Sequence, residues 1–101
     1  MVEFLVTVPG GTGGGYYIGG VQKPIIPVVT GGTFRFNQND STNDFHPLIL
    51  STTTSTAGII STGVSYYLDG PSNATNYRNT SLFNAIRTKV PLKLNRKLKV
   101  R

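Results

Sequence analysis

The stretch GGTFRFNQNDSTNDFHPLILSTTTST, residues 31–56, decides the fold that the sequence predicts. It opens with a glycine pair and continues into a segment in which Phe34 and Phe36 alternate with polar residues. A polar loop follows that holds the single histidine of the chain, His46, and then Leu48 and Leu50 alternate in the same way. An apolar residue at every second position predicts a β-strand with one buried face. We therefore expect two strands here, each of which needs a partner sheet.

Length and composition indicate a single β-rich domain. The chain has 101 residues, which allows one domain. Alanine is rare, and no window repeats apolar residues at helical spacing, so we expect an all-β fold. The absence of cysteine excludes a disulfide or a thiolate metal site within the chain. No apolar run approaches the ~18 residues of a membrane span, and the first residues do not resemble a signal peptide.

The same alternation predicts further strands on both sides of the central stretch. They are expected at residues 2–8, 16–18, 21–23 and 64–68. Residues 24–30 contain two prolines, which predict either an edge strand or a strand that starts after Pro27, followed by a glycine turn into Phe34. Residues 73–80 are rich in Asn and Thr, and we expect them to form a loop.

The polar loop of the central stretch is expected to be structural. Side chains of Asn, Asp and Ser hydrogen-bond to nearby backbone, and residues 37–44 consist largely of such residues. The structural candidates in and after this loop are Gln38, Asp40, Asn43 and His46. The oxygen-bearing side chains leave calcium binding as an alternative, although the glycine and glutamate of an EF-hand loop are absent.

His46 is weighed separately because imidazole is a common metal ligand. A blue-copper site needs two histidines and a cysteine, whereas this chain has one histidine, no cysteine and a single methionine, Met1. We therefore expect the His46 ring to hydrogen-bond to a loop carbonyl or to Asp44, with Pro47 holding the backbone before it extended. The chain also lacks a nucleophile elbow and a phosphate-binding lysine motif. No catalytic, metal or cofactor-binding residue is expected, and the protein is not expected to be an enzyme.

The C-terminal segment, residues 86–101, is expected to be a basic, two-faced strand or arm of the same domain as the body, residues 1–85. Its apolar residues fall at even positions and most of its cations at odd positions, as on the two faces of a strand. The candidates for partner contact are the odd-numbered cations Arg87, Lys89, Lys93, Lys97, Lys99 and Arg101. Contact with nucleic-acid phosphates, docking onto an acidic partner and protection of a sheet edge remain open. No aromatic residue interleaves these cations, which disfavours base stacking.

The central stretch also carries a family resemblance. The pattern begins with GGTF, residues 31–34, and a second phenylalanine at position 36. It continues with Gln38, Asp40, Asn43 and His46-Pro47 at their particular spacing, and ends with LILSTT, residues 48–53. Further matching segments are YYIGG, residues 16–20, and GVSYYLDG, residues 63–70. This pattern resembles a cupredoxin-like β-sandwich domain that recurs in structural and tail proteins of marine bacteriophages, especially cyanophages.

The resemblance implies a Greek-key β-sandwich of about seven strands and a place in a virus particle. The expected function is that of a structural module of the virion, in the capsid decoration, tail or fibre, assembled in the host cytoplasm. Its expected partners are other virion proteins or copies of itself, with no cofactor and no membrane. The resemblance ends near Ala85, because family members continue into strands with cysteine and histidine. The alternatives are binding of host-surface glycans by Tyr16, Tyr17, Tyr66 and Tyr67, and nucleic-acid contact through the basic C-terminal strand.

Overall fold

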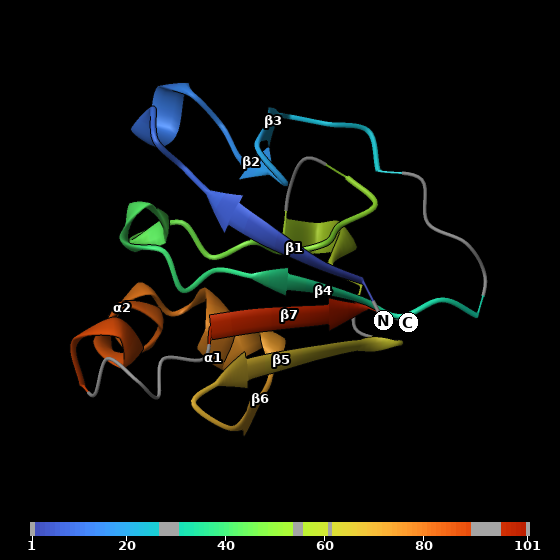
Figure 1. Ribbon diagram of the computed structural model, residues 1–101. Helices are drawn as coiled ribbons and strands as arrows, with labels where there is room; N and C mark the ends of the chain where they lie inside the picture. Colours follow the sequence, from blue (N-terminus) through green and yellow to red (C-terminus); the bar gives the residue numbers. More distant parts are fainter. Residues whose placement is uncertain (1, 27–30, 54–55, 61, 90–95, 101) are drawn as a thin grey trace.

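The computed structural model describes residues 2–26, 31–53, 56–60, 62–89 and 96–100 (Figure 1). Within these ranges the chain forms seven strands and two α-helices. The strands are β1 (Val2–Thr7), β2 (Tyr17–Ile18), β3 (Val21–Gln22), β4 (Phe34–Asn37), β5 (Val64–Leu68), β6 (Pro71–Ser72) and β7 (Arg96–Val100). The helices are α1 (Ala74–Arg78) and α2 (Thr80–Lys89), and the 3-10 turns are η1 (Gly11–Gly13), η2 (Ser41–Asn43) and η3 (Thr56–Gly58). The expected β-rich fold is confirmed.

The strands follow one another in the order β3-β2-β1-β4-β7-β5-β6. The two strands β1 and β4 are parallel, with Val2 opposite Phe34 and Leu5 opposite Asn37. The remaining neighbours are antiparallel. The C-terminal strand β7 pairs with β4 on one side and with β5 on the other, so its backbone lies inside the sheet.

Tight turns join the shortest strands. Gly19 and Gly20 connect β2 to β3 with φ angles of 61° and 85°. Two successive positive φ angles are the requirement of a type I′ hairpin turn, which glycine meets without steric cost. Asp69 and Gly70 connect β5 to β6, again with two positive φ angles. Both turns join antiparallel strand pairs.

The core lies between one face of the sheet and the two helices. Val6, Phe34, Phe36 and Tyr66 come from the strands, and they pack with Tyr77 of α1 and Phe83 of α2. The Tyr77 ring has its centroid 5.2 Å from the rings of both Tyr66 and Phe83. Figure 1 shows α1 behind β5 and β7, so the helices cover one face, and no described helix lies over the other, which is called the uncovered face below.

Both helices correct the sequence prediction. Residues 74–78 were expected in a loop and form α1, whereas residues 86–89 were expected in a strand and end α2. Asn73 accepts a hydrogen bond from the N–H of Asn76, and Asn79 accepts from the N–H groups of Ser81 and Leu82. Asparagine in such positions caps the free N–H groups at the beginning of a helix, which explains why each helix starts where it does.

The strand expected around Leu48 is also absent from its predicted place. Residues 46–50 have no regular secondary structure, although Leu48, Ile49 and Leu50 all pack against the core. The Leu50 carbonyl accepts a hydrogen bond from Ile60, and Ser51 forms an isolated bridge with Ile59. Three consecutive core contacts need an irregular backbone, because a strand would turn every second side chain away from the core.

The C-terminal prediction holds only for residues 96–100. The prediction for residues 90–95 and Arg101 lies outside the described residues, as does the part of the proline-rich edge strand at residues 27–30. Since β7 is paired on both sides, the reading of residues 96–100 as an edge guard is wrong. For the same reason the backbone of β7 offers no free edge for strand pairing with a partner.

Candidate functional site

The loop between β4 and residue 48 is built around the side chain of Gln38, which is completely buried. Its Nε2 group donates to Asn43 Oδ1 at 3.0 Å and to the His46 carbonyl at 2.9 Å. Its Oε1 atom accepts from the Leu48 N–H at 2.8 Å and from the Tyr77 hydroxyl at 2.7 Å. A primary amide can make four such bonds, so this side chain is fully satisfied. Because Leu48 N–H can only donate, the orientation of the amide is also determined.

Asn43, likewise completely buried, ties the loop to the first strand. Its Nδ2 group donates to the Val6 carbonyl at 2.7 Å and to the Asp40 carbonyl at 3.1 Å. Directly after β1, the Val8 N–H donates to Thr42 Oγ1 at 2.8 Å. Asp40 begins the η2 turn, where its Oδ1 accepts from the N–H and the hydroxyl of Thr42. The pairing of β1 with β4 ends at Leu5 and Asn37. Beyond that point the loop supplies the hydrogen-bond partners of Val6 and Val8.

His46 takes part in this network through its backbone. Its N–H donates to the Asn43 carbonyl at 2.8 Å, and its carbonyl accepts from Gln38 and from the Tyr16 hydroxyl. Within the described residues, the hydrogen bonds that the structure shows for His46 all involve its backbone N–H or carbonyl. The expected hydrogen bond from the imidazole ring is not among them. The Tyr16 hydroxyl also donates to the Pro47 carbonyl at 3.1 Å. Burial raises the pKa of Tyr16 to about 12.

Phe45 stands at the tip of this loop and is 70% exposed. Its φ angle is 69°, in the left-handed region that bulky side chains rarely adopt. The conformation is held in place by a hydrogen bond of 2.8 Å from the Phe45 N–H to Asn84 Oδ1 on α2. An aromatic ring is therefore presented to solvent at a cost in backbone energy.

The four loop residues expected from the sequence are thus brought together, but in three different ways. Gln38 and Asn43 bond through buried side chains, Asp40 through the turn that it caps, and His46 through its backbone. The sequence did not indicate that two of these polar side chains are buried. Tyr77, which completes the bonding of Gln38, lies in a segment that was expected to be a loop.

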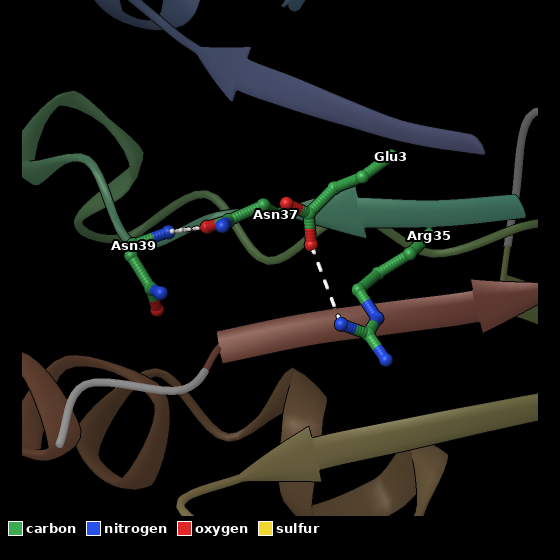
Figure 2. A network of polar contacts seen from close by, with 4 residues as sticks. All are labelled: Glu3, Arg35, Asn37 and Asn39. Carbon is green, nitrogen blue, oxygen red and sulfur yellow. Dashed lines mark hydrogen bonds and ion pairs between the residues drawn. The ribbon is translucent and has the colours of Figure 1, made fainter. Parts of the chain in front are cut away.

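The second notable surface is the uncovered face of the sheet. Glu3 of β1 and Arg35 of β4 stand on it, with Arg35 Nη1 3.5 Å from Glu3 Oε1 (Figure 2). Both side chains are partly exposed to water, which weakens this ion pair. Figure 2 also shows Asn37, whose Oδ1 accepts from the Asn39 N–H at 2.9 Å. The register of β7 places Lys99 opposite Arg35, and Lys97 opposite Asn37.

The paired tyrosines are divided between the core and this face. Tyr66 is buried and Tyr16 packs against the core cluster, whereas Tyr17 and Tyr67 fall at the alternate positions of β2 and β5. The Tyr66 hydroxyl is buried without a hydrogen-bond partner among the described residues, and its burial raises its pKa while Arg78 lowers it. Tyr16 and Tyr66 therefore pack inward, and of the four tyrosines Tyr17 and Tyr67 are the two on the outer face.

The six cations expected to contact a partner do not share one strand. Arg87 and Lys89 belong to α2, Lys97 and Lys99 to β7, and the predictions for Lys93 and Arg101 lie outside the described residues. The alternation of apolar and basic residues corresponds to a strand at residues 96–100, whereas residues 86–89 are helical. The structure places a further cation, Arg35, next to these two lysines, because Arg35 of β4 lies opposite Lys99 of β7.

Within the described ranges, no group of three or more His, Cys, Asp or Glu residues is placed to hold a metal ion. The same part of the chain contains no helix with the length and apolar character needed to cross a membrane. Comparison with known proteins found no matching protein family, no similar curated protein and no similar solved structure.

Proposed function

We propose that this protein is a non-enzymatic structural module of a bacteriophage particle, in the capsid decoration, tail or fibre, that acts by contact with other virion proteins. It would be assembled into the virion in the host cytoplasm. The resemblance of residues 31–53 to domains of phage structural proteins motivates the proposal. The finer fold prediction, a cupredoxin-like Greek-key sandwich, belongs to the same proposal.

The observation that carries the proposal is the presentation of Phe45. Residues in strained backbone conformations persist where the surrounding structure holds them, and such strain is concentrated at functional sites. Phe45 combines a left-handed backbone with a ring that is 70% exposed. Aromatic side chains that bury a large area on binding are the usual anchors of protein interfaces. Phe45 is therefore the residue that we assign to contact with a partner protein.

The Gln38 network supports this role by fixing the base of the same loop. The polar groups that could otherwise bind a ligand are used within the protein, since Gln38 and Asn43 bond to each other and to β1, α1 and residues 46–48. A rigid base lowers the entropy that the loop loses on association. The arrangement supports passive attachment through the loop tip.

Quantitative mass spectrometry of purified particles tests the proposal, using the phage that carries the gene. We expect the chain in the particle at a fixed ratio to the major capsid or tail protein, and its absence from mature particles would contradict the proposal. Particles assembled with Phe45→Ala protein supplied in trans should contain less of the chain. Ile25→Ala is the matched control, because Ile25 is also an exposed apolar residue, at 97%, but belongs to a different segment. The mass of the free protein by light scattering would then separate a trimeric fibre from a monomeric decoration.

A further inference from the structure

The uncovered sheet face gathers positive charge from strands that are far apart in the sequence. Lys99 of β7 lies directly opposite Arg35 of β4, and Lys97 is two residues away on the same strand. Of the four acidic residues in the chain, Glu3 alone belongs to a strand. Directly opposite residues on antiparallel strands have Cβ atoms about 5 Å apart, and like charges in such pairs are destabilising. A sheet that places two cations opposite each other is suited to an anionic partner.

The topology also supplies aromatic residues that the C-terminal segment itself lacks. Tyr67 of β5 lies opposite Lys97 of β7, and Asn37 of β4 lies opposite Lys97 on the other side. Tyr17 belongs to the same face two strands further on, beside β1. Registered residues of neighbouring strands share a face of the sheet, so cations alternate here with aromatic and amide groups. Residues 86–101 contain no aromatic residue of their own, but the register places Tyr67 opposite Lys97, so an aromatic residue is available for base stacking.

We propose that this face, formed by Arg35, Asn37, Ser65, Tyr67, Lys97 and Lys99, binds single-stranded nucleic acid. The cations would contact phosphates, and Tyr67 would stack on a base, as aromatic residues on open sheets do in single-strand binding domains. An acidic polypeptide would satisfy the charge, but stacking of a base on Tyr67, which lies opposite Lys97, favours single-stranded nucleic acid. This proposal is independent of the proposed role in the particle.

The first test is fluorescence anisotropy with a labelled oligothymidylate of about a dozen nucleotides, within the site sizes of such domains. We expect binding that weakens as salt rises from about 50 to 200 mM, with a log-log slope near −2 for three phosphate contacts. The triple variant R35Q/K97Q/K99Q should lose most of the affinity and of the salt dependence. Tyr67→Ala should weaken binding about tenfold, the effect of one lost stacking contact.

Two matched variants separate the site from total charge. K23Q/R78Q/K89Q removes the same number of cations from positions outside this face and should bind like the wild type. R35K/K97R/K99R keeps the charge and should retain binding, and circular dichroism of each variant verifies its fold. Photocrosslinking of the oligonucleotide to the wild-type protein, which needs no variant, should map to Tyr67.

Three results would overturn the proposal. One is the absence of binding at about 50 mM salt, where phosphate contacts are strongest. Another is an equal loss of affinity in the two charge-neutralising triple variants, which would mean attraction by net charge alone. The third is competition by polyglutamate as strong as by the oligonucleotide together with no effect of Tyr67→Ala, which would assign the face to an acidic polypeptide.

Discussion

The Tyr77 hydroxyl donates a hydrogen bond of 2.7 Å to Gln38 Oε1, and both side chains are completely buried. This bond joins the helical layer to the loop that leaves β4, across 39 residues of sequence. Buried polar groups are costly unless all of them are hydrogen-bonded. Here several of the bonds share the amide of Gln38, so the loss of one partner affects the others. The base of the loop is consequently one cooperative unit with α1 and β1.

Gln38→Leu should destabilise the protein severely. The substitution keeps the approximate volume but removes the bonds of the amide to its partners, including the Leu48 N–H and the Tyr77 hydroxyl. Each buried group that loses such a bond costs about 1–3 kcal/mol, so we expect a loss of about 3 kcal/mol or more in the free energy of unfolding. Tyr77→Phe, which removes the bond to Gln38 Oε1, should cost about 1–2 kcal/mol. Urea unfolding measures both, and equal stability of Gln38→Leu and wild type would contradict the network.

The helix caps at Asn73 and Asn79 should each be worth about 1 kcal/mol. Asn73→Ala and Asn79→Ala remove the acceptors of the first N–H groups of α1 and α2. Asn76→Ala is the control, because Asn76 lies within α1, where alanine is the better helix former. We expect it to leave thermal stability unchanged or raise it. Equal losses for Asn73→Ala and Asn76→Ala would indicate that residues 74–78 are not helical.

Stability should fall at alkaline pH because of Tyr16. Burial raises the pKa of Tyr16 from 10.0 to about 12, so the folded protein holds this proton more tightly than the unfolded chain. The stabilisation is therefore complete below pH 10 and is lost as the pH rises from 10 towards 12. Tyr16→Phe cannot ionise, so its urea midpoint should decline less steeply over this range, although the lost bonds to His46 and Pro47 lower it at neutral pH. Parallel pH profiles would contradict the burial of this hydroxyl.

The backbone of Phe45 should carry measurable strain. A left-handed conformation costs an ordinary residue about 1 kcal/mol or more, whereas asparagine adopts it more readily. Phe45→Asn should therefore be more stable than Phe45→Ala by about 1 kcal/mol in thermal unfolding, since both lack the exposed ring. If the two variants have the same stability, the φ angle of 69° is not maintained in solution.

The strands with clear alternation could be predicted from the sequence. The alternating residues of β1, β4 and β5 and the glycine pair between β2 and β3 identify these elements without further information. Burial of Gln38 and Asn43 could not be predicted, because their partners at Val6 and Tyr77 are about 37 and 39 residues away. Local sequence cannot distinguish an exposed polar side chain from a buried one when the hydrogen-bond partners of the buried side chain are distant in the chain.

The sequence signal for both helices is capping. Asn73 and Asn79 precede α1 and α2 and are good N-cap residues, whereas the even-numbered apolar residues from Ile86 onward favour a strand. The spacing from Ile86 to Val90 is also one helical turn, so position parity over so few residues cannot separate helix from strand. The place of β7 between β4 and β5 depends on tertiary pairing that no local pattern reports.

Amide hydrogen exchange at Leu48, followed by NMR with and without Ca²⁺ or Cu²⁺, tests most directly whether the loop serves structure rather than ligand binding. The Leu48 N–H is bonded to Gln38 Oε1 at 2.8 Å within a buried network. We expect exchange as slow as that of the central strands, unchanged by either metal ion. Rapid exchange that becomes slow when a metal ion is added would contradict this account, because the loop would then be a binding site that orders around its ligand.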